Sequence, residues 1–408
     1  MSHPDGFHLL PAIAAIAPET WDALVDATCP HAAPCFRHAY LLALEQSACV
    51  GGRSGWTPAH ATLWAGGHAI AAMPLYLKAH SYGEYVFDWA WAEAYHRHGL
   101  EYYPKWLAAL PFTPVPGPRL LGRDLAARRE LLAATLTHAR QSELSSFHLL
   151  FLHEADLALA HEAGLLIREG VQFEWTNRSA PSRADGSSRP GGTEPLLSAT
   201  AWSNFDAFLS SLSQPKRKKI RQERRRAGEQ NLALQWLDGH SASTQDWNFF
   251  HRCYATTYAL HRSTPYLSAE FFQRLARRMP DAVRLLVARR DREALAAAFF
   301  LCDGTTLYGR YWGALEDLPF VHFELCYYQA IEYCLANGLQ RFEGGAQGEH
   351  KLSRGLLPKR TWSAHWIADS RFASAIDDYL VRERRGTDLY LDDLAERTPF
   401  RRALPDHD

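Results

Sequence analysis

The second half of the chain alternates between strand-like and helix-like hydrophobic patterns. Three apolar runs predict strands: Arg284–Arg290, Leu295–Cys302 and Thr305–Trp312. Asp303-Gly304 predicts a tight hairpin turn between the last two strands. The next segment, "VHFELCYYQAIEYCLANG", has apolar residues at helical spacing and predicts a helix that ends near Gly338. A short strand at Leu339–Glu343 and another within "TWSAHWIA" follow.

The first half repeats this order of elements. "HATLWAGGHAIAAMPLYLKAH" predicts a hairpin, and Glu84–Asp88 predicts a third strand. Further along we expect a helix at Leu125–Gln141, a strand in "FHLLFL", a helix at Glu154–Ala163 and a strand in "LLIREGVQFEW". Antiparallel strands followed by helix–strand alternation therefore occur twice. This predicts an α/β (α+β) chain of two tandem domains, each with a mixed, mostly antiparallel sheet flanked by helices.

A polar stretch separates the two halves. Residues 178–201 are rich in Ser, Pro, Gly, Ala and Thr, and such a composition buries too little apolar surface to form a core. We therefore expect an N-terminal domain at residues 1–177, a flexible linker or insertion at 178–201, and a C-terminal domain at 202–408.

Composition narrows the classes of protein. The net charge is −1 over 408 residues, so any attraction to nucleic acid must come from a local patch. The seven Cys are scattered without a C-x-x-C pair, which favours free thiols in a reducing compartment and disfavours zinc ligation. The sequence also has no H-E-x-x-H motif, and we expect no metal. No apolar run approaches the roughly 20 residues of a membrane span, and the N-terminus is a poor signal peptide. We expect a soluble cytoplasmic protein.

The stretch "RFEGGAQGEHKLSRGLLP" carries the strongest candidate site. Gly344-Gly345 allows a sharp turn and a close approach of a ligand to the backbone. Reactive and charged side chains follow within eight positions: Gln347, Glu349, His350, Lys351 and Arg354. In a helical turn, Lys351 and Arg354 share a face and could hold a phosphate or carboxylate, while His350 or Glu343 could act as a base. The alternative is a solvated loop whose cations pair with Glu343 and Glu349.

Two further segments are candidates for binding. "QPKRKKIRQERRRAGEQ" predicts a basic helix, starting at Pro215, that would attract phosphates through Lys216, Arg217, Lys219 and Arg221; the alternative is a solvated charged helix. "YGEYVFDWAWAEAYHRHGLEYYPK" mixes aromatic and polar side chains and predicts a binding cleft formed by Asp88, Trp89, Trp91, Tyr95 and Arg97. Its alternative is an aromatic core with charges at the rim.

Several motifs together resemble the FemAB-like proteins, a peptidoglycan biosynthesis or recognition family of the GNAT acyltransferase superfamily. These motifs are "PVPGPRLL", "KRKKIRQER", "YWGA", "FEGGAQGEHKLSRGLLPKRTWSAHWI" and "FDWAWAEAYHRHGLEYYPK". The resemblance spans nearly the whole chain. It implies two GNAT-like domains in tandem and a likeness to the peptidoglycan-bridge aminoacyltransferases, which move an amino acid from aminoacyl-tRNA to an amine. The polar stretch after Asn177 is a departure from the family pattern.

The resemblance leaves two classes of donor, acyl-CoA and aminoacyl-tRNA. GNAT enzymes usually bind the pyrophosphate of acyl-CoA with a glycine-rich loop between the fourth strand and the next helix. The matching join here, "WGALEDLPFVHFEL", has one glycine and the acidic pair Glu316-Asp317, which would repel a pyrophosphate. This favours aminoacyl-tRNA, or a phosphate site elsewhere.

The resulting prediction is an acyl- or aminoacyltransferase that forms an amide on a small-molecule or peptide amine. His350 or Glu343 would accept the amine proton, and Lys351 would stabilise the oxyanion or bind donor phosphate. The binding residues would be Arg354, Gln347, Glu349, Tyr311, Trp312, the basic helix and the aromatic cleft. No tightly bound cofactor is expected, with aminoacyl-tRNA or acyl-CoA as co-substrate. The alternatives are a non-catalytic module that binds a cell-wall precursor, peptide or nucleic acid, and an acyl-CoA-dependent N-acetyltransferase with an atypical CoA site.

Overall fold

The computed structural model describes residues 3–177, 201–346 and 348–401, which form two compact units. Unit 1 comprises Met1–Gly170, Pro265–Pro280 and Arg360–Asp388, and unit 2 comprises Val171–Thr264, Asp281–Lys359 and Leu389–Asp408. The predicted linker at 178–201 lies almost entirely outside the described residues. Two strands, β9 (Leu166–Thr176) and β15 (Leu357–Ile367), and the helix α12 (Ser370–Glu396) each run from one unit into the other.

Unit 1 contains two sheets. The first has the order β1-β3-β4-β7, with β1 Gly6–Leu10, β3 His60–Ala65, β4 His68–Met73 and β7 Leu121–Gly122. The second has the order β15-β8-β6-β5-β2, with β8 Ser146–Leu152, β6 Lys105–Ala108, β5 Leu75–Lys78 and β2 Trp56–Pro58. Its helices are α1 Pro18–Thr28, α2 His38–Gln46, α3 Trp89–Arg97, α4 Leu125–Gln141, α5 Glu154–Glu162 and α9 Ala269–Arg278, with short 3-10 turns at η1 Ile13–Ala15 and η2 Pro34–Phe36. Only β6 and β8 pair in parallel among the described neighbours of the second sheet.

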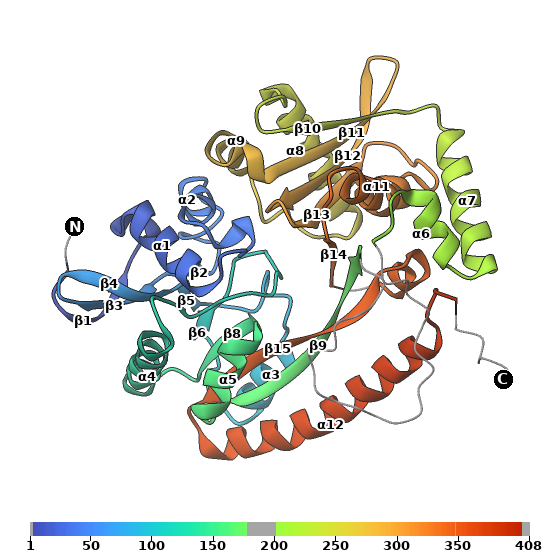
Figure 1. Cartoon of the computed structure of the whole chain (residues 1–408). Coiled ribbons are helices and arrows are strands. Elements are labelled where there is room, and N and C mark those ends of the chain that lie inside the picture. Colours follow the sequence, from blue (N-terminus) through green and yellow to red (C-terminus); the bar gives the residue numbers. More distant parts are fainter. Residues whose placement is uncertain (1–2, 178–200, 347, 402–408) are drawn as a thin grey trace. The chain divides into compact units, whose positions relative to one another are not determined.

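Unit 2 is built on one mixed sheet with the order β10-β11-β12-β13-β14-β9 (Figure 1). The strands are β10 Ala233–Asp238, β11 Val283–Arg290, β12 Glu293–Cys302, β13 Thr306–Ala314 and β14 Arg341–Ala346. The helices are α6 Phe205–Ser211, α7 Gln214–Gly228, α8 Thr244–Leu260, α10 Val321–Phe323, the π-helical turn η4 Glu324–Tyr328, α11 Gln329–Ala336 and the 3-10 turns η3 Pro280–Ala282 and η5 Glu349–Arg354. The pair β13–β14 is parallel and the other described pairs are antiparallel.

Local signals in the sequence place most of these elements. The predicted helix Leu125–Gln141 is confirmed as α4, because the Asp124 side chain accepts a hydrogen bond from Ala127 N at 2.8 Å and caps its first turn. The hairpin at Asp303-Gly304 is also confirmed. The side chain of Asp303 accepts hydrogen bonds from the N–H groups of Thr305 and Thr306, which fixes the turn.

The predicted strand at Glu84–Asp88 is wrong. These residues form a loop before α3. The Nζ atom of Lys105 donates to Glu84 Oε2 at 2.8 Å and to Asp88 Oδ2 at 2.5 Å, and all three side chains are buried. Side-chain ion pairs, which the alternating pattern does not reveal, hold this segment in place of a ladder of backbone hydrogen bonds.

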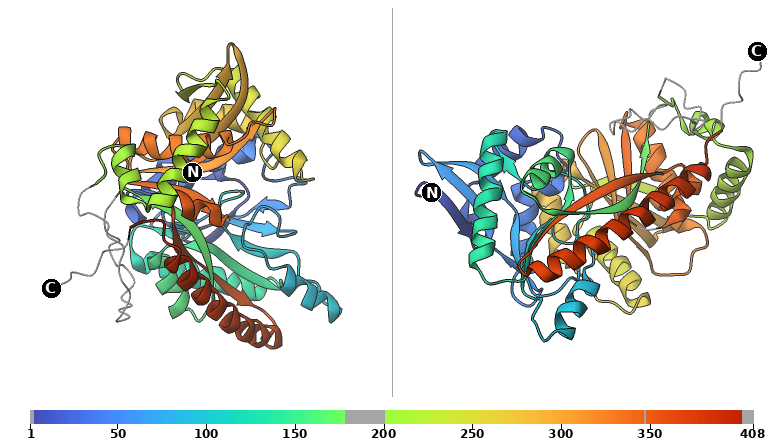
Figure 2. Two further views of the ribbon diagram at one scale, coloured as in Figure 1. Left: turned by 90° about the vertical axis from the view of Figure 1, so that its right-hand side faces the viewer. Right: turned by 90° about the horizontal axis from the view of Figure 1, so that it is seen from below.

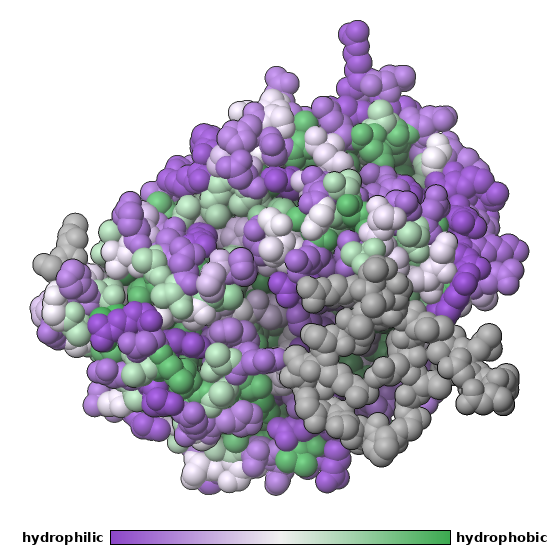
Figure 3. Space-filling model, viewed as in Figure 1, coloured by the Kyte–Doolittle hydropathy of each residue, from purple (hydrophilic) through white to green (hydrophobic). Residues whose placement is uncertain are grey.

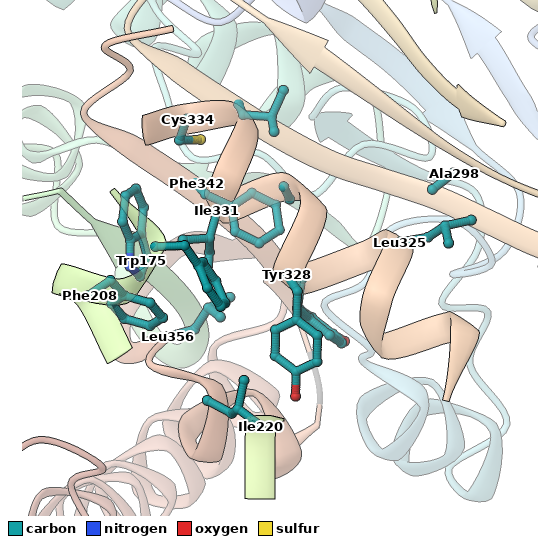
Figure 4. Packing of buried hydrophobic residues seen from close by; sticks show 14 of the residues in the cluster. Trp175, Phe208, Ile220, Ala298, Leu325, Tyr328, Ile331, Cys334, Phe342 and Leu356 are labelled. Carbon is teal, nitrogen blue, oxygen red and sulfur yellow. The ribbon is translucent and has the colours of Figure 1, made fainter. Parts of the chain in front are cut away.

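The core of unit 2 lies between the sheet and the helices that follow β9 and β13. Figure 4 shows Phe342 and Ala298 from the strands facing Leu325 and Ile331 of the helical segment. Trp175, Phe208 and Ile220 extend the same cluster, and Ile220 lies on the buried side of α7. α8 contacts the sheet at β12 and β13. A Cβ atom at Gly313 would collide with the carbonyl of Cys253, so this glycine lets α8 approach β13 closely.

The longest helix is α12, which is continuous over 27 residues (Figure 2). Within the described residues, neither α12 nor any other helix is long and apolar enough to cross a bilayer.

Candidate functional site

The parallel strands β13 and β14 separate after three register pairs. Thr306, Leu307 and Tyr308 pair with Arg341, Phe342 and Glu343, and no further pair follows in the described part of the two strands. Arg310 forms a bulge in β13, because Phe299 pairs with Tyr311 while the next residue, Phe300, pairs with Gly309. β14 then reaches Gly344-Gly345, and Gly345 has a φ of 73° that favours glycine.

A pocket of about 120 Å³ lies where the strands separate. Its lining comes from β12, β13, β14, η5 and the helical segment α10–η4: Ala298, Phe299, Phe300, Gly309, Arg310, Tyr311, Trp312, His322, Cys326, Tyr327, Phe342, Gly344 and Lys351. The glycines keep this region close-packed, since a Cβ atom at Gly309 would lie 3.1 Å from the Phe342 ring. The pocket therefore unites the predicted residues Tyr311, Trp312 and Lys351 in one place.

Lys351 brings a buried amine to this pocket. Its side chain is 5% exposed, and Nζ donates to the carbonyl oxygen of Gly345 at 3.2 Å. Burial lowers the pKa of Lys351 to about 8. At neutral pH it is therefore mainly an ammonium group.

His350 lies beside the pocket and contacts it through Tyr327. The Tyr327 hydroxyl and His350 Nε2 are 2.9 Å apart, and the tautomer of His350 decides which atom donates. Removal of the ring from water, followed by the charges of Arg354 and Lys351, lowers the pKa of His350. The imidazole is thus neutral at pH 7 and able to accept a proton.

A second histidine, His322, lines the pocket directly. Its ring stacks on Trp312 with centroids 4.4 Å apart, and burial lowers its pKa to about 4. It is consequently uncharged at neutral pH. The thiol of Cys326 has a raised pKa for the same reason, which makes it a poor nucleophile.

Arg354 points away from the pocket. Its Nη2 atom donates to both carboxylate oxygens of Glu223 at 2.9 and 2.8 Å, Nη1 donates to the carbonyl of His350 at 2.7 Å, and Nε donates to the Tyr328 hydroxyl at 3.1 Å. The guanidinium also lies 3.6 Å from the centre of the Phe323 ring. Arg354 thereby joins η5 to α7, and it would have to leave Glu223 to bind a donor phosphate.

The other predicted residues of the stretch 341–358 lie outside the pocket or outside the described residues. Glu343 is on the opposite side of β14 from Phe342, because successive side chains of a strand alternate. Its pKa is raised to about 7 by burial and then by Glu174. Glu349 is exposed and accepts a hydrogen bond from Arg397 at 3.1 Å. Gln347 lies outside the described residues.

The basic helix α7 divides its charges between the interior and the solvent. Arg224 donates to Glu324 and Glu332, and Arg217 donates to the carbonyl of Leu212 at 2.8 Å. Lys216 and Arg217 are half-buried. The exposed cations are Lys218, Lys219, Arg221, Arg225 and Arg226, and Figure 3 shows a hydrophilic surface over this helix.

The predicted aromatic cleft is mostly interior. Trp91 and Tyr95 belong to a buried cluster of unit 1, in which Tyr95 lies 4.0 Å from the Phe372 ring. Asp88 is 4% exposed and binds Lys105. Trp89 is 52% exposed and stacks on Phe87, and Arg97 is exposed and 3.5 Å from Glu93.

Several residues of the pocket are not indicated by the sequence. Tyr327 looked like part of a helical core stripe, and Cys326 and His322 carried no local signal. Cys326 and Tyr327 belong to the π-helical turn η4, an irregularity that is frequent at functional sites, and His322 lies in α10 immediately before it. Within the described residues there is no cluster of His, Cys, Asp and Glu able to hold a metal ion.

Comparisons with solved structures define the class of fold. FemX is 11% identical with a TM-score of 0.53, over 89% of this chain and 98% of FemX. The C-terminal domain of a putative lysylphosphatidylglycerol synthetase from Agrobacterium fabrum is 11% identical with a TM-score of 0.51, over 88% of this chain and 96% of that domain. L-PGS from Bacillus licheniformis is 10% identical with a TM-score of 0.50, over 86% of this chain and 92% of L-PGS. These likenesses show a shared fold.

The family follows from the sequence itself. The model of the FemAB-like family, described as peptidoglycan biosynthesis/recognition, matches residues 12–186 and 191–402. This chain belongs to the FemAB-like family, as its motifs indicate. No curated protein sequence matches it.

Proposed function

We propose that unit 2 transfers an acyl group from an ester or thioester donor to an amine, forming an amide. The observation that carries this proposal is the buried Lys351 ammonium in a pocket at the divergence of β13 and β14. A cation placed at a reacting carbonyl stabilises the oxyanion of a tetrahedral intermediate. Membership of the FemAB-like family supports transferase chemistry.

The proposed reaction needs no covalent intermediate on the protein. The amine nitrogen attacks the carbonyl carbon, the bond to the leaving oxygen or sulfur breaks, and the amine loses one proton. The neutral His350 accepts that proton through the Tyr327 hydroxyl, which lines the pocket, and returns it to the leaving group. The raised pKa of Cys326 argues against a thioester on the enzyme.

The donor carries phosphates in this proposal. Exposed cations of α7 attract a phosphate-rich donor, and Glu223 of α7 holds Arg354 of η5, so the helix is attached to the turn that carries Lys351. Aminoacyl-tRNA and acyl-CoA share this chemistry. The likeness of the family to peptidoglycan-bridge aminoacyltransferases supports the first, and the acidic join at Glu316-Asp317 weighs against the usual CoA site.

An acyl-transfer assay with mass-spectrometric detection tests the proposal. The full chain is incubated with a mixture of primary amines and one donor at a time, in one reaction aminoacyl-tRNA and in another acyl-CoA. We expect an amide product with one donor class, and a rise in melting temperature with the same donor. A rise in melting temperature without product from either donor would favour the alternative of a non-catalytic binding module.

A further inference from the structure

The turn that carries Lys351 is too short to hold itself in place. η5 contains six residues and lies between Gly348 and Gly355. A 3-10 turn of this length is not stable by itself, so contacts with the rest of unit 2 must fix it. At its tip, the Lys351 side chain donates to the carbonyl oxygen of Gly345 at 3.2 Å. At its root, the direction of the side chain depends on what holds the backbone of η5.

Arg354 holds that backbone at the residue before Lys351. Its Nη1 atom donates to the carbonyl oxygen of His350 at 2.7 Å. This carbonyl belongs to the peptide bond between His350 and Lys351, which is planar. A hydrogen bond to its oxygen therefore restricts rotation of the peptide unit from which the Lys351 side chain departs. The ring of His350 is held separately, by the Tyr327 hydroxyl at 2.9 Å.

Arg354 is itself held by two further elements. Both carboxylate oxygens of Glu223 on α7 accept from its Nη2 atom, and the Tyr328 hydroxyl of η4 accepts from its Nε atom at 3.1 Å. The Tyr328 hydroxyl also donates to Glu223, so the two partners of Arg354 are bound to each other. All three side chains are buried. A planar guanidinium has donors in fixed directions for three partners at once, and a lysine ammonium in its place cannot reproduce this arrangement.

We propose that Arg354 is the positioning residue of Lys351. Bound to Glu223 and Tyr328, it holds the preceding peptide unit so that the Lys351 ammonium stays at the pocket. This inference rests on the proposed acyl transfer, because it explains how the group that stabilises the oxyanion is kept in place. Arg354 acts through Lys351 and does not bind the phosphate of the donor.

The pKa of the Lys351 amine tests this inference without turnover. Burial lowers that pKa to about 8, whereas an amine released into water has a pKa of about 10.4. Competitive acetylation of the full chain with a trace of acetic anhydride between pH 7 and pH 10, measured by mass spectrometry, titrates Lys351. Arg354→Lys keeps a cation beside Glu223 but loses the other fixed donors. In this variant we expect the pKa of Lys351 to rise to about 9 or higher.

Kinetics of acyl transfer separates positioning from donor binding. Arg354→Lys should lower kcat about 10–100-fold and leave the KM for the donor unchanged, since a misplaced catalytic group costs a factor of that order. The loss should disappear when Lys351 is absent. Lys351→Ala combined with Arg354→Lys should therefore stay within about twofold of Lys351→Ala alone. Tyr328→Phe removes one support of the guanidinium and should give a smaller loss of kcat, which keeps the test decisive if Arg354→Lys fails to fold.

Arg284 and Tyr333 provide matched controls in unit 2. Arg284 donates from Nε to the Tyr333 hydroxyl at 2.7 Å and from Nη1 to two backbone carbonyls, a similar set of bonds that does not involve η5. Arg284→Lys and Tyr333→Phe should leave both kcat and the pKa of Lys351 unchanged.

Three results would overturn the inference. The first is a Lys351 pKa that stays at about 8 in both Arg354→Lys and Tyr328→Phe. The second is a pair of losses that multiply in the double variant. The third is a rise in KM at unchanged kcat, which would assign Arg354 to the donor phosphate. Failure of the proposed function looks different: the wild type forms no amide product from any donor, although the pKa of Lys351 still rises in Arg354→Lys.

Discussion

Glu343 of β14 lies directly opposite Glu174 of β9 in an antiparallel register pair. Two carboxylates in this position repel each other. Lys359 donates to Glu174 Oε2 at 3.0 Å, and the charges of Lys359, Arg341 and Arg310 offset only part of the effect on Glu343. Burial and this repulsion raise the pKa of Glu343 to about 7. The pair therefore places a group that titrates near neutral pH immediately before Gly344-Gly345.

This pair predicts how stability depends on pH. The pKa of Glu343 is higher in the folded protein than in the unfolded chain, so its contribution to stability is fully present below about pH 4.5 and is lost as pH rises through about 7. Glu343→Gln removes this loss. Relative to the wild type, the variant should gain about 1–3 kcal/mol in the free energy of unfolding between pH 5 and pH 8. Urea unfolding at pH 5, 6, 7 and 8 measures the difference; a difference that is constant across this range contradicts the assignment.

The Arg354–Glu223 ion pair predicts a structural effect. Both side chains are at least nine-tenths buried, so Arg354→Ala leaves an unpaired carboxylate in the interior and should cost about 3–5 kcal/mol. The double variant Arg354→Met with Glu223→Leu removes both charges and should recover most of that loss. Chemical denaturation of the three proteins measures this. If Arg354→Ala has the stability of the wild type but loses donor binding, Arg354 is a phosphate ligand instead.

The surface of α7 predicts a salt-dependent interaction. Lys219→Ala with Arg221→Ala removes two exposed cations and should weaken binding of tRNA, and the slope of log K against log salt should fall by about two. Filter binding between low and physiological salt measures the slope. Arg292→Ala in the β11–β12 turn removes one exposed charge elsewhere in unit 2 and serves as the control. An unchanged slope in the double variant excludes α7 as a tRNA contact.

Much of the fold could be predicted from local patterns. α4 and the Asp303-Gly304 hairpin depend on periodicity, a cap and turn residues, all of which are readable within a few positions. The strand predicted at Glu84–Asp88 was wrong, because the residue that holds this loop, Lys105, is 21 residues from Glu84 and 17 from Asp88 in the chain. Local pattern carries no information about such a partner.

The site was predictable as a segment but not as a geometry. The stretch around Lys351 does form a helical turn beside a glycine pair, as its residues indicate. That Lys351 faces the pocket while Arg354 faces Glu223, 131 positions away, depends on tertiary packing. The same holds for Tyr327, which lies in a π-helical turn where the sequence suggests a regular helix.

The most direct test of the proposed acyl transfer is the kcat/KM of Lys351→Ala in the acyl-transfer assay, with the donor that the wild type uses. Removal of one oxyanion-stabilising donor typically lowers the rate about 10²–10³-fold, and we predict a loss of that size. The melting temperature should stay near that of the wild type, and Arg292→Ala should keep full activity. A Lys351→Ala protein that is folded and retains the wild-type kcat/KM would contradict the central claim that Lys351 stabilises the reacting carbonyl.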